Sequence, residues 1–237
     1  MFCGLWLFTS LILAILFIII SIFFLNQAKK NKEVISLKRY SIGISIFMLI
    51  LGINGFIDLG AMYATEVLNQ YDLFSESDQL LKAGQTSFFI IISLLMIGFA
   101  VLSYQIEKYI KQSKRKILTT ILIICFIISL IPYFGHYIPI EYHYLIKNIV
   151  YGTQIPFTFI IIYWGVFYLA LAKNTTGVVR RRAIMVAFGL GFLFFGIIMD
   201  TIYRWSTDAL YLIPFLLKCI SNTGAILLML GFKREEL

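Results

Sequence analysis

The sequence predicts an all-α integral membrane protein, a seven-transmembrane-helix bundle that occupies residues 1–237 as a single domain. Composition is the first observation behind this prediction. The chain is 60% hydrophobic and only 14% charged, whereas soluble domains are roughly half apolar and about a quarter charged. Spacing is the second observation, because the apolar residues fall into seven long runs, and a helix of ~20 apolar residues spans the ~30 Å hydrocarbon core of a bilayer.

Short connections separate the seven runs and leave no room for a second, soluble domain. The first run exceeds the roughly 7–15-residue core of a signal peptide and has no basic residue before it, so we expect a retained first span. The longest connection, between the second and third spans, is expected to be a solvated linker. The predicted spans are approximately residues 5–25, 40–63, 86–104, 117–134, 148–172, 183–203 and 209–232.

Basic residues predict the orientation of the bundle. Most of the 20 lysine and arginine residues fall in the first, third and fifth connections and in the carboxyl-terminal tail. Because cytoplasmic loops are enriched in Lys and Arg, we expect the amino terminus outside a cell membrane and the carboxyl terminus in the cytoplasm. The same clusters are suited to anionic lipid headgroups. This distribution accounts for the net charge of +8, so nucleic acid is not a predicted partner.

A weak internal repeat relates the two halves of the chain. Arg39 precedes Asp58 by 19 residues, and Arg182 precedes Asp200 by 18 residues. Spans one to three would then match spans five to seven in parallel orientation, with the fourth span as a linker, and such 3+1+3 repeats occur in transporters. The alternative is that basic residues simply recur in every cytoplasmic loop.

The last apolar run contains Lys218 near its middle. An ammonium at that depth costs roughly 3 kcal/mol or more, so it marks by default a functional site or a structural ion pair. Helical spacing places Tyr211, Pro214, Ser221 and Asn222 on the same face as Lys218.

Polar residues of other spans share faces in the same way. Asn54 and Asp58 lie one turn apart in the second span, as do Gln154 and Thr158 in the fifth. Asp200 follows a groove of small residues in the sixth span, at Gly189 and Gly196, that allows another helix to pack closely. We expect these groups to line an outward-facing cavity that ends at Lys218. The candidate ligand-binding residues are Lys218, Asp58, Asp200, Asn54, Gln154, Thr158, Ser221, Asn222 and Tyr211.

The leading functional prediction is a receptor or sensor that binds a small polar or anionic ligand through Lys218. Asp58 or Asp200 would pair with Lys218 in the empty site, and a cytoplasmic partner protein would receive the signal. A secondary transporter is the alternative. It is disfavoured by the few polar residues in the cytoplasmic half of the spans, which are mainly Ser21, Ser45, Ser103, Thr119 and Thr120. A membrane scaffold with purely structural buried charges is the third possibility.

Two resemblances bear on these alternatives. A lysine in the middle of a seventh span resembles the retinal-binding lysine of microbial rhodopsins, which would imply retinal on Lys218. That family has an aspartate one turn before the lysine, where this chain has Pro214. The 3+1+3 arrangement resembles the seven-helix sugar transporters, but their repeated proline-glutamine signature is absent.

Enzymatic activity is not predicted. The sequence contains no HExxH helix, no glycine-rich phosphate loop and no evident pairing of a nucleophile with a base. Apart from the retinal alternative, neither a cofactor nor a metal site is expected.

Overall fold

The computed structural model describes the backbone of residues 2–30, 34–70, 77–131, 145, 148–149, 152–204 and 212–233, and the side chains of most of them. Over these ranges the chain is helical and contains no strand, which confirms the predicted all-α class. Four helical stretches within the described residues are long and apolar enough to cross a membrane: Leu7–Lys30, Ile35–Gly60, Ile90–Ile110 and Gln154–Lys173. The seven-span topology and its orientation stay predictions.

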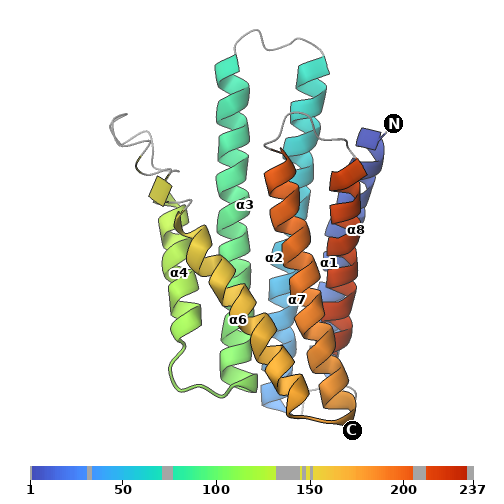
Figure 1. Ribbon diagram of the computed structural model, residues 1–237, viewed down its shortest axis with the longest axis vertical. Helices are drawn as coiled ribbons and strands as arrows, with labels where there is room; N and C mark the ends of the chain where they lie inside the picture. Colours follow the sequence, from blue (N-terminus) through green and yellow to red (C-terminus); the bar gives the residue numbers. More distant parts are fainter. Residues whose placement is uncertain are drawn as a thin grey trace. The chain divides into compact units, whose positions relative to one another are not determined.

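Four helices, Phe2–Lys30, Ile35–Gln70, Ser77–Gln105 and Gly177–Arg204, extend beyond the apolar runs that predict them (Figure 1). A helix satisfies its own backbone hydrogen bonds and so continues through polar residues beyond an apolar run. The connection expected between the second and third spans is therefore largely helical. In chain order the elements are α1 (Phe2–Lys30), α2 (Ile35–Gln70), α3 (Ser77–Gln105), the π-helical turn η1 (Ile106–Ile110), α4 (Ile117–Ser129), α6 (Gln154–Lys173), α7 (Gly177–Arg204) and α8 (Leu212–Phe232).

The chain divides into two compact units. Unit 1 contains Met1–Ile20 and Phe159–Leu237, which include the first part of α1, most of α6, and α7 and α8. Unit 2 contains Ser21–Thr158, with the end of α1, then α2, α3, η1 and α4. The single domain and the 3+1+3 repeat stay predictions.

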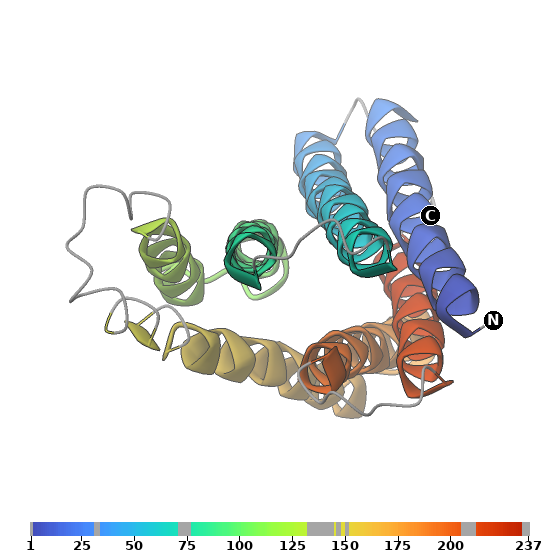
Figure 2. The same ribbon diagram turned by 90° about the horizontal axis from the view of Figure 1, so that it is seen from above.

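In unit 2, helix α3 packs against both α2 and α4, and Figure 2 shows it between them. Aromatic side chains fill this interior. The ring of Phe99 in α3 lies edge-on to Phe47 of α2 and to Phe157, with 5.2 Å between ring centroids in each pair. Such edge-to-face pairs contribute roughly 0.5–1.5 kcal/mol beyond the burial of their area.

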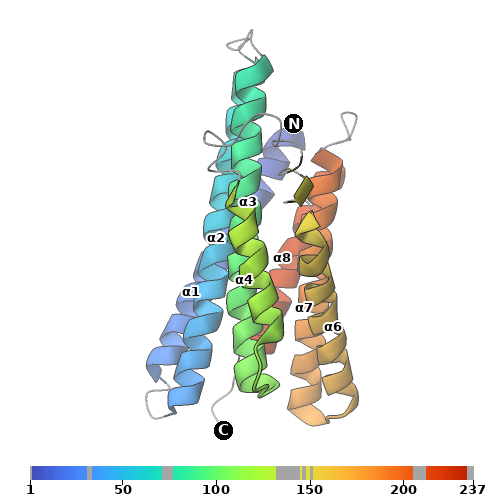
Figure 3. The same cartoon turned by 90° about the vertical axis from the view of Figure 1, so that its left-hand side faces the viewer.

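Buried hydroxyl pairs also join neighbouring helices of unit 2. The Oγ atoms of Ser93 and Ser129 lie 2.8 Å apart and link α3 to α4, which lies in front of α3 in Figure 3. The Oγ atoms of Ser21 and Ser45 lie 2.9 Å apart and link the end of α1 to α2. Small hydroxyl side chains satisfy each other here without spacing the helices apart.

In unit 1, helices α7 and α8 form a close antiparallel pair, and Figure 2 shows them next to each other. A Cβ atom added to Gly189 of α7 would lie 2.9 Å from the backbone nitrogen of Leu228 and 3.0 Å from the carbonyl oxygen of Gly224, both in α8. One added to Gly231 would lie 3.0 Å from the nitrogen of Val186. The predicted groove of small residues in α7 is therefore confirmed, and α8 occupies it. We call this contact the α7–α8 seam.

Candidate functional site

The buried lysine of α8 lies on a mainly apolar helix. The side chain of Lys218 is 6% exposed and that of Ser221, one turn further on, is 1% exposed. Asn222 is half-buried. These three predicted residues therefore share one part of α8 inside unit 1. A charged group so far from water requires polar neighbours or a counter-charge.

One close approach of α7 to α8 lies beside this lysine. A Cβ atom on Gly196 would lie 2.7 Å from the carbonyl oxygen of Leu217 and would overlap the hydroxyl of Ser221. That hydroxyl donates a hydrogen bond to the Leu217 carbonyl at 3.1 Å. The backbone of α7 thus lies directly against the turn of α8 that carries Lys218, which fixes the position of that turn.

Unit 1 also contains buried polar atoms with unused hydrogen-bonding capacity. Neither Oδ1 of Asn222 nor Oγ of Ser10 has a hydrogen-bond partner among the described residues. Ser10 is only 3% exposed. A buried polar group without a partner costs roughly 1–3 kcal/mol, and water or a ligand commonly supplies the missing partner.

The remaining α7 and α8 candidates are only partly described. Asp200 lies in α7 four residues, or about one turn, beyond Gly196, which faces α8. Its side chain is outside the described residues. The side chain of Pro214 is likewise outside them, and Tyr211 is outside them altogether.

The other predicted site residues belong to unit 2. Asn54 is 8% exposed, and its Oδ1 has no hydrogen-bond partner among the described residues. Asp58, one turn further along α2, is half-buried. Gln154 and Thr158 are also half-buried, and the Thr158 hydroxyl donates to the Gln154 carbonyl oxygen at 2.8 Å. That these residues line one cavity with Lys218 stays a prediction.

Sequence reasoning missed a buried carboxylate at the end of α3. Glu107, in η1, is 2% exposed. Its Oε1 accepts a hydrogen bond from the backbone nitrogen of Leu118 at 3.2 Å. Its Oε2 accepts bonds from the nitrogen of Thr119 at 3.1 Å and from the Thr119 hydroxyl at 2.6 Å. Glu107 thus caps the amino terminus of α4, where a negative charge is favourable.

The π-helical turn shapes the chain that follows it. The Lys111 nitrogen bonds to the Ile106 carbonyl at 2.8 Å, and the Ser113 nitrogen bonds to the Glu107 carbonyl at 2.8 Å. Lys116 turns inward, and its Nζ donates to the carbonyl oxygens of Glu107, at 3.2 Å, and of Ser113. The only signal in the sequence is a single glutamate within the basic third connection.

Gln105 was also missed. It is 7% exposed, and its amide lies against Gly43 of α2, where any added Cβ atom would overlap it. Its Oε1 has no hydrogen-bond partner among the described residues. Gly43 is what allows a long polar side chain to enter between α2 and α3, and its only trace in the sequence is one glycine in an apolar run.

Tyrosines surround Lys108, the single lysine of η1. Lys108 Nζ donates to the hydroxyl of Tyr104 at 2.7 Å and lies 5.4 Å from the ring centroid of Tyr109. Tyr109 in turn contacts the ring of Tyr40 in α2, with centroids 6.1 Å apart. This cluster places the second turn of α2 beside η1.

Comparison of the chain with models of protein families, with curated proteins and with solved structures found no match in any of the three.

Proposed function

We propose that this chain is a multi-pass protein of a cell membrane, and that it acts as a receptor or sensor for a small polar or anionic ligand bound through Lys218. The membrane location is supported by four long apolar helical stretches. It is also supported by large apolar side chains exposed along them, such as Ile19 at 56% and Phe159 at 64%. Faces of this kind are suited to contact with lipid chains.

The burial of Lys218 is the observation that carries the ligand proposal. Its side chain is 6% exposed within an apolar helix, and an ionisable group in such a place is usually functional or paired. The ammonium offers three hydrogen-bond donors to an anion. Asn222 Oδ1 and Ser10 Oγ, both without a hydrogen-bond partner among the described residues, add polar groups to the same unit. A small anion that also carries hydroxyl or amide groups fits this set.

Signalling would follow from competition for the lysine. In the empty protein the ammonium pairs with a carboxylate. The first candidate is Asp200, which lies one helical turn beyond Gly196 in α7. The second candidate is Asp58. A ligand that replaces this carboxylate favours whichever helix arrangement separates the pair. The predicted cytoplasmic connections are short, so a partner protein would receive the change.

A secondary transporter is the second candidate, and one observation favours it. Buried polar side chains continue into the half of the helices predicted to be cytoplasmic, where Gln105 is 7% and Glu107 is 2% exposed. A scarcity of polar groups in that half is the argument against a transporter, and the burial of Gln105 and Glu107 weakens that argument.

Thermal unfolding of the detergent-purified chain tests the ligand proposal. The chain is heated with and without members of a panel of small carboxylates, phosphates, sugars and retinal. We expect at least one compound to stabilise the native chain and to lose this effect in Lys218→Met. The matched control is Lys173→Met, because Lys173 is an exposed lysine at the end of α6, and this variant should respond as the native chain does.

The proposal fails if no compound stabilises the native chain, or if an active compound stabilises Lys218→Met equally. Either result would assign Lys218 a structural role in a membrane scaffold. If a compound does bind through Lys218, uptake of that compound into proteoliposomes would identify a transporter, and binding without uptake a receptor.

A further inference from the structure

One end of unit 2 presents only positive charge among its described, exposed side chains. The second turn of α2 lies beside η1 there, because Tyr40 contacts Tyr109. The one described acidic side chain at this end is Glu107, which is buried and accepts hydrogen bonds from the first turn of α4. Glu33 lies outside the described residues. The exposed basic side chains are Lys29, Lys30, Lys38, Arg39, Lys111, Lys114 and Arg115.

The segment between η1 and α4 holds three of these cations on a fixed backbone. The Ser113 hydroxyl donates to the Arg115 carbonyl at 2.7 Å, and Lys116 bonds back to the Glu107 carbonyl at 3.2 Å. Gln112 adopts a left-handed conformation with φ of +51°, which is uncommon outside glycine and reverses the chain direction locally. The connection is therefore a turn held by hydrogen bonds of Ser113 and Lys116.

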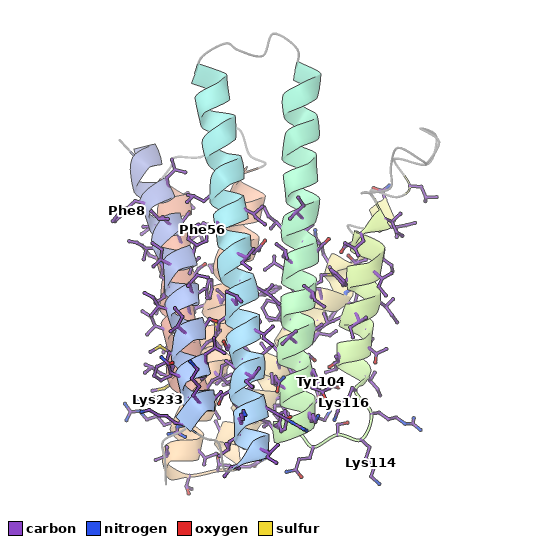
Figure 4. The ribbon with its side chains drawn as sticks, turned by 180° about the vertical axis from the view of Figure 1, so that it is seen from behind. Phe8, Phe56, Tyr104, Lys114, Lys116 and Lys233 are labelled. Carbon is purple, nitrogen blue, oxygen red and sulfur yellow. The ribbon has the colours of Figure 1, made fainter. Side chains whose placement is uncertain are left out.

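The side chains of this turn divide into two sets. Lys116 is half-buried, whereas Lys114 and Arg115 are exposed. In Figure 4, Lys114 extends away from the helix ends, while Lys116 lies beside the end of α3 near Tyr104. The Lys116 side chain thus helps to hold the turn together, whereas the side chains of Lys114 and Arg115 are accessible at the surface.

The position of the turn favours lipid over a soluble partner. It is only six residues long, from Lys111 to Lys116, and both ends continue into apolar helices. Ile117, directly after it, is 56% exposed. If α3 spans the membrane as proposed, these cations lie within a few residues of the hydrocarbon edge, at the depth of the lipid phosphates.

We propose that the η1–α4 turn is a preformed binding site for the phosphate headgroup of an anionic lipid, contacted by Lys114 and Arg115 and held in shape by Glu107 and Lys116. This proposal rests on the proposed membrane location but is independent of a ligand at Lys218. The basic residues at the ends of α1 and α2 extend the same surface.

Native mass spectrometry of the full chain in neutral detergent tests this site, with dioctanoyl phosphatidic acid as the probe and dioctanoyl phosphatidylcholine as the neutral control. We expect the native chain to retain phosphatidic acid in preference to phosphatidylcholine. The double variant Lys114→Gln/Arg115→Gln should bind it about tenfold more weakly, since each cation near a headgroup contributes measurably to binding. Arg180→Gln/Arg181→Gln removes two exposed cations from α7, outside the η1–α4 turn, and should weaken binding less than Lys114→Gln/Arg115→Gln does.

Glu107→Gln separates a preformed site from simple charge attraction, because the two predict opposite signs. Removal of a negative charge would tighten binding if net charge alone governed it. We expect weaker binding instead, because the turn loses its anchor on α4, and Thr119→Val should act in the same direction. Tighter binding by Glu107→Gln, or unchanged binding by Lys114→Gln/Arg115→Gln, would overturn the proposal.

Competition identifies the source of the phosphate and the class of partner. Inorganic phosphate at the concentration of the lipid should not displace phosphatidic acid, because the lipid chains also contact the apolar helices. Displacement by inorganic phosphate would overturn the assignment to lipid. Equal displacement by a poly-glutamate peptide would assign the surface to an acidic protein segment and would also overturn it.

These results are distinct from those for Lys218. Loss of lipid binding in Lys114→Gln/Arg115→Gln leaves the thermal response to a small ligand unchanged, and Lys218→Met leaves lipid retention unchanged. Failure of one proposal therefore does not imply failure of the other.

Discussion

Gly224 of α8 lies so close to Leu193 of α7 that a Cβ atom on Gly224 would come within 2.5 Å of the Leu193 backbone nitrogen. The neighbouring atom belongs to a helix backbone, so no side-chain rotation can relieve the overlap. Small residues allow such contact, and close backbone packing is a main source of helix association where no water can drive it. The α7–α8 seam is thus specified by its glycines.

We expect Gly224→Ala to destabilise the protein by about 1–3 kcal/mol, because the added methyl group forces α7 and α8 apart. The matched control is Gly191→Ala in α7, since an added Cβ atom there has no atom within 4 Å. That substitution should be neutral or slightly stabilising, because alanine favours a helix by up to ~1 kcal/mol over glycine. Thermal unfolding in detergent measures both. Equal effects of the two substitutions would contradict the prediction that close packing against α7 restricts residue 224 to glycine.

Gly43→Ala should also destabilise the protein, but a second substitution should rescue it. The methyl group would overlap the Gln105 side chain, so Gln105 must leave its position between α2 and α3. In Gln105→Ala that obstacle is gone. We therefore expect Gly43→Ala to cost substantially less in the Gln105→Ala background than in the native chain. Additive changes in the unfolding temperature would show that Gly43 is constrained by something other than Gln105.

Thr119→Val should destabilise unit 2 by about 2 kcal/mol, because a buried hydrogen bond to a charged group is lost. The Thr119 hydroxyl lies 2.6 Å from Glu107 Oε2, and valine keeps the shape of threonine without the donor. Thr120→Val is the control, since Thr120 is exposed and its hydroxyl bonds only within the local turn, to the Lys116 carbonyl at 2.8 Å. Hydrogen exchange of the η1–α4 segment should rise in the first variant and not in the second.

Asp200 and Lys218 are expected to be energetically coupled. Lys218→Met or Asp200→Asn alone would leave an uncompensated charge in an apolar place, which typically costs ~3–5 kcal/mol for a buried pair. The double variant removes both charges and should be more stable than the sum of the single changes implies. A double-mutant cycle of unfolding free energies measures this coupling. Strict additivity would exclude the pair and leave Asp58 as the predicted partner.

The helices were predictable from the sequence because each is marked by a run of about 20 mostly apolar residues. In a membrane, such a run has few alternatives to a helix. The groove at Gly189 and Gly196 was also predictable, since small residues at helical spacing have a physical use whichever helix fills the groove. Which helix fills it was not, because the partner residues on α8 are set by tertiary packing.

Burial of the residues at the end of α3 was not predictable in the same way. Gln105 and Glu107 are next to a basic connection, and polar residues in such a position are typical of a solvated loop. Their burial depends on Gly43 of α2 and on the free backbone N–H groups at residues 118 and 119, which lie elsewhere in the chain. A polar side chain that meets its partner only after folding leaves no periodic signal. The apolar run of the third span therefore ends at residue 104, before the π-helical turn.

The spacing of the glycines restricts how α8 can move. Gly189 and Gly196 in α7, and Gly224 and Gly231 in α8, are each seven residues apart, or about 10 Å along a helix axis. Sliding α8 by a single turn would bring leucine onto the α7 backbone, so translation is blocked until a whole repeat has passed. A rearrangement that separates Lys218 from a carboxylate on α7 would therefore have to change the angle or rotation between the two helices, rather than slide one along the other.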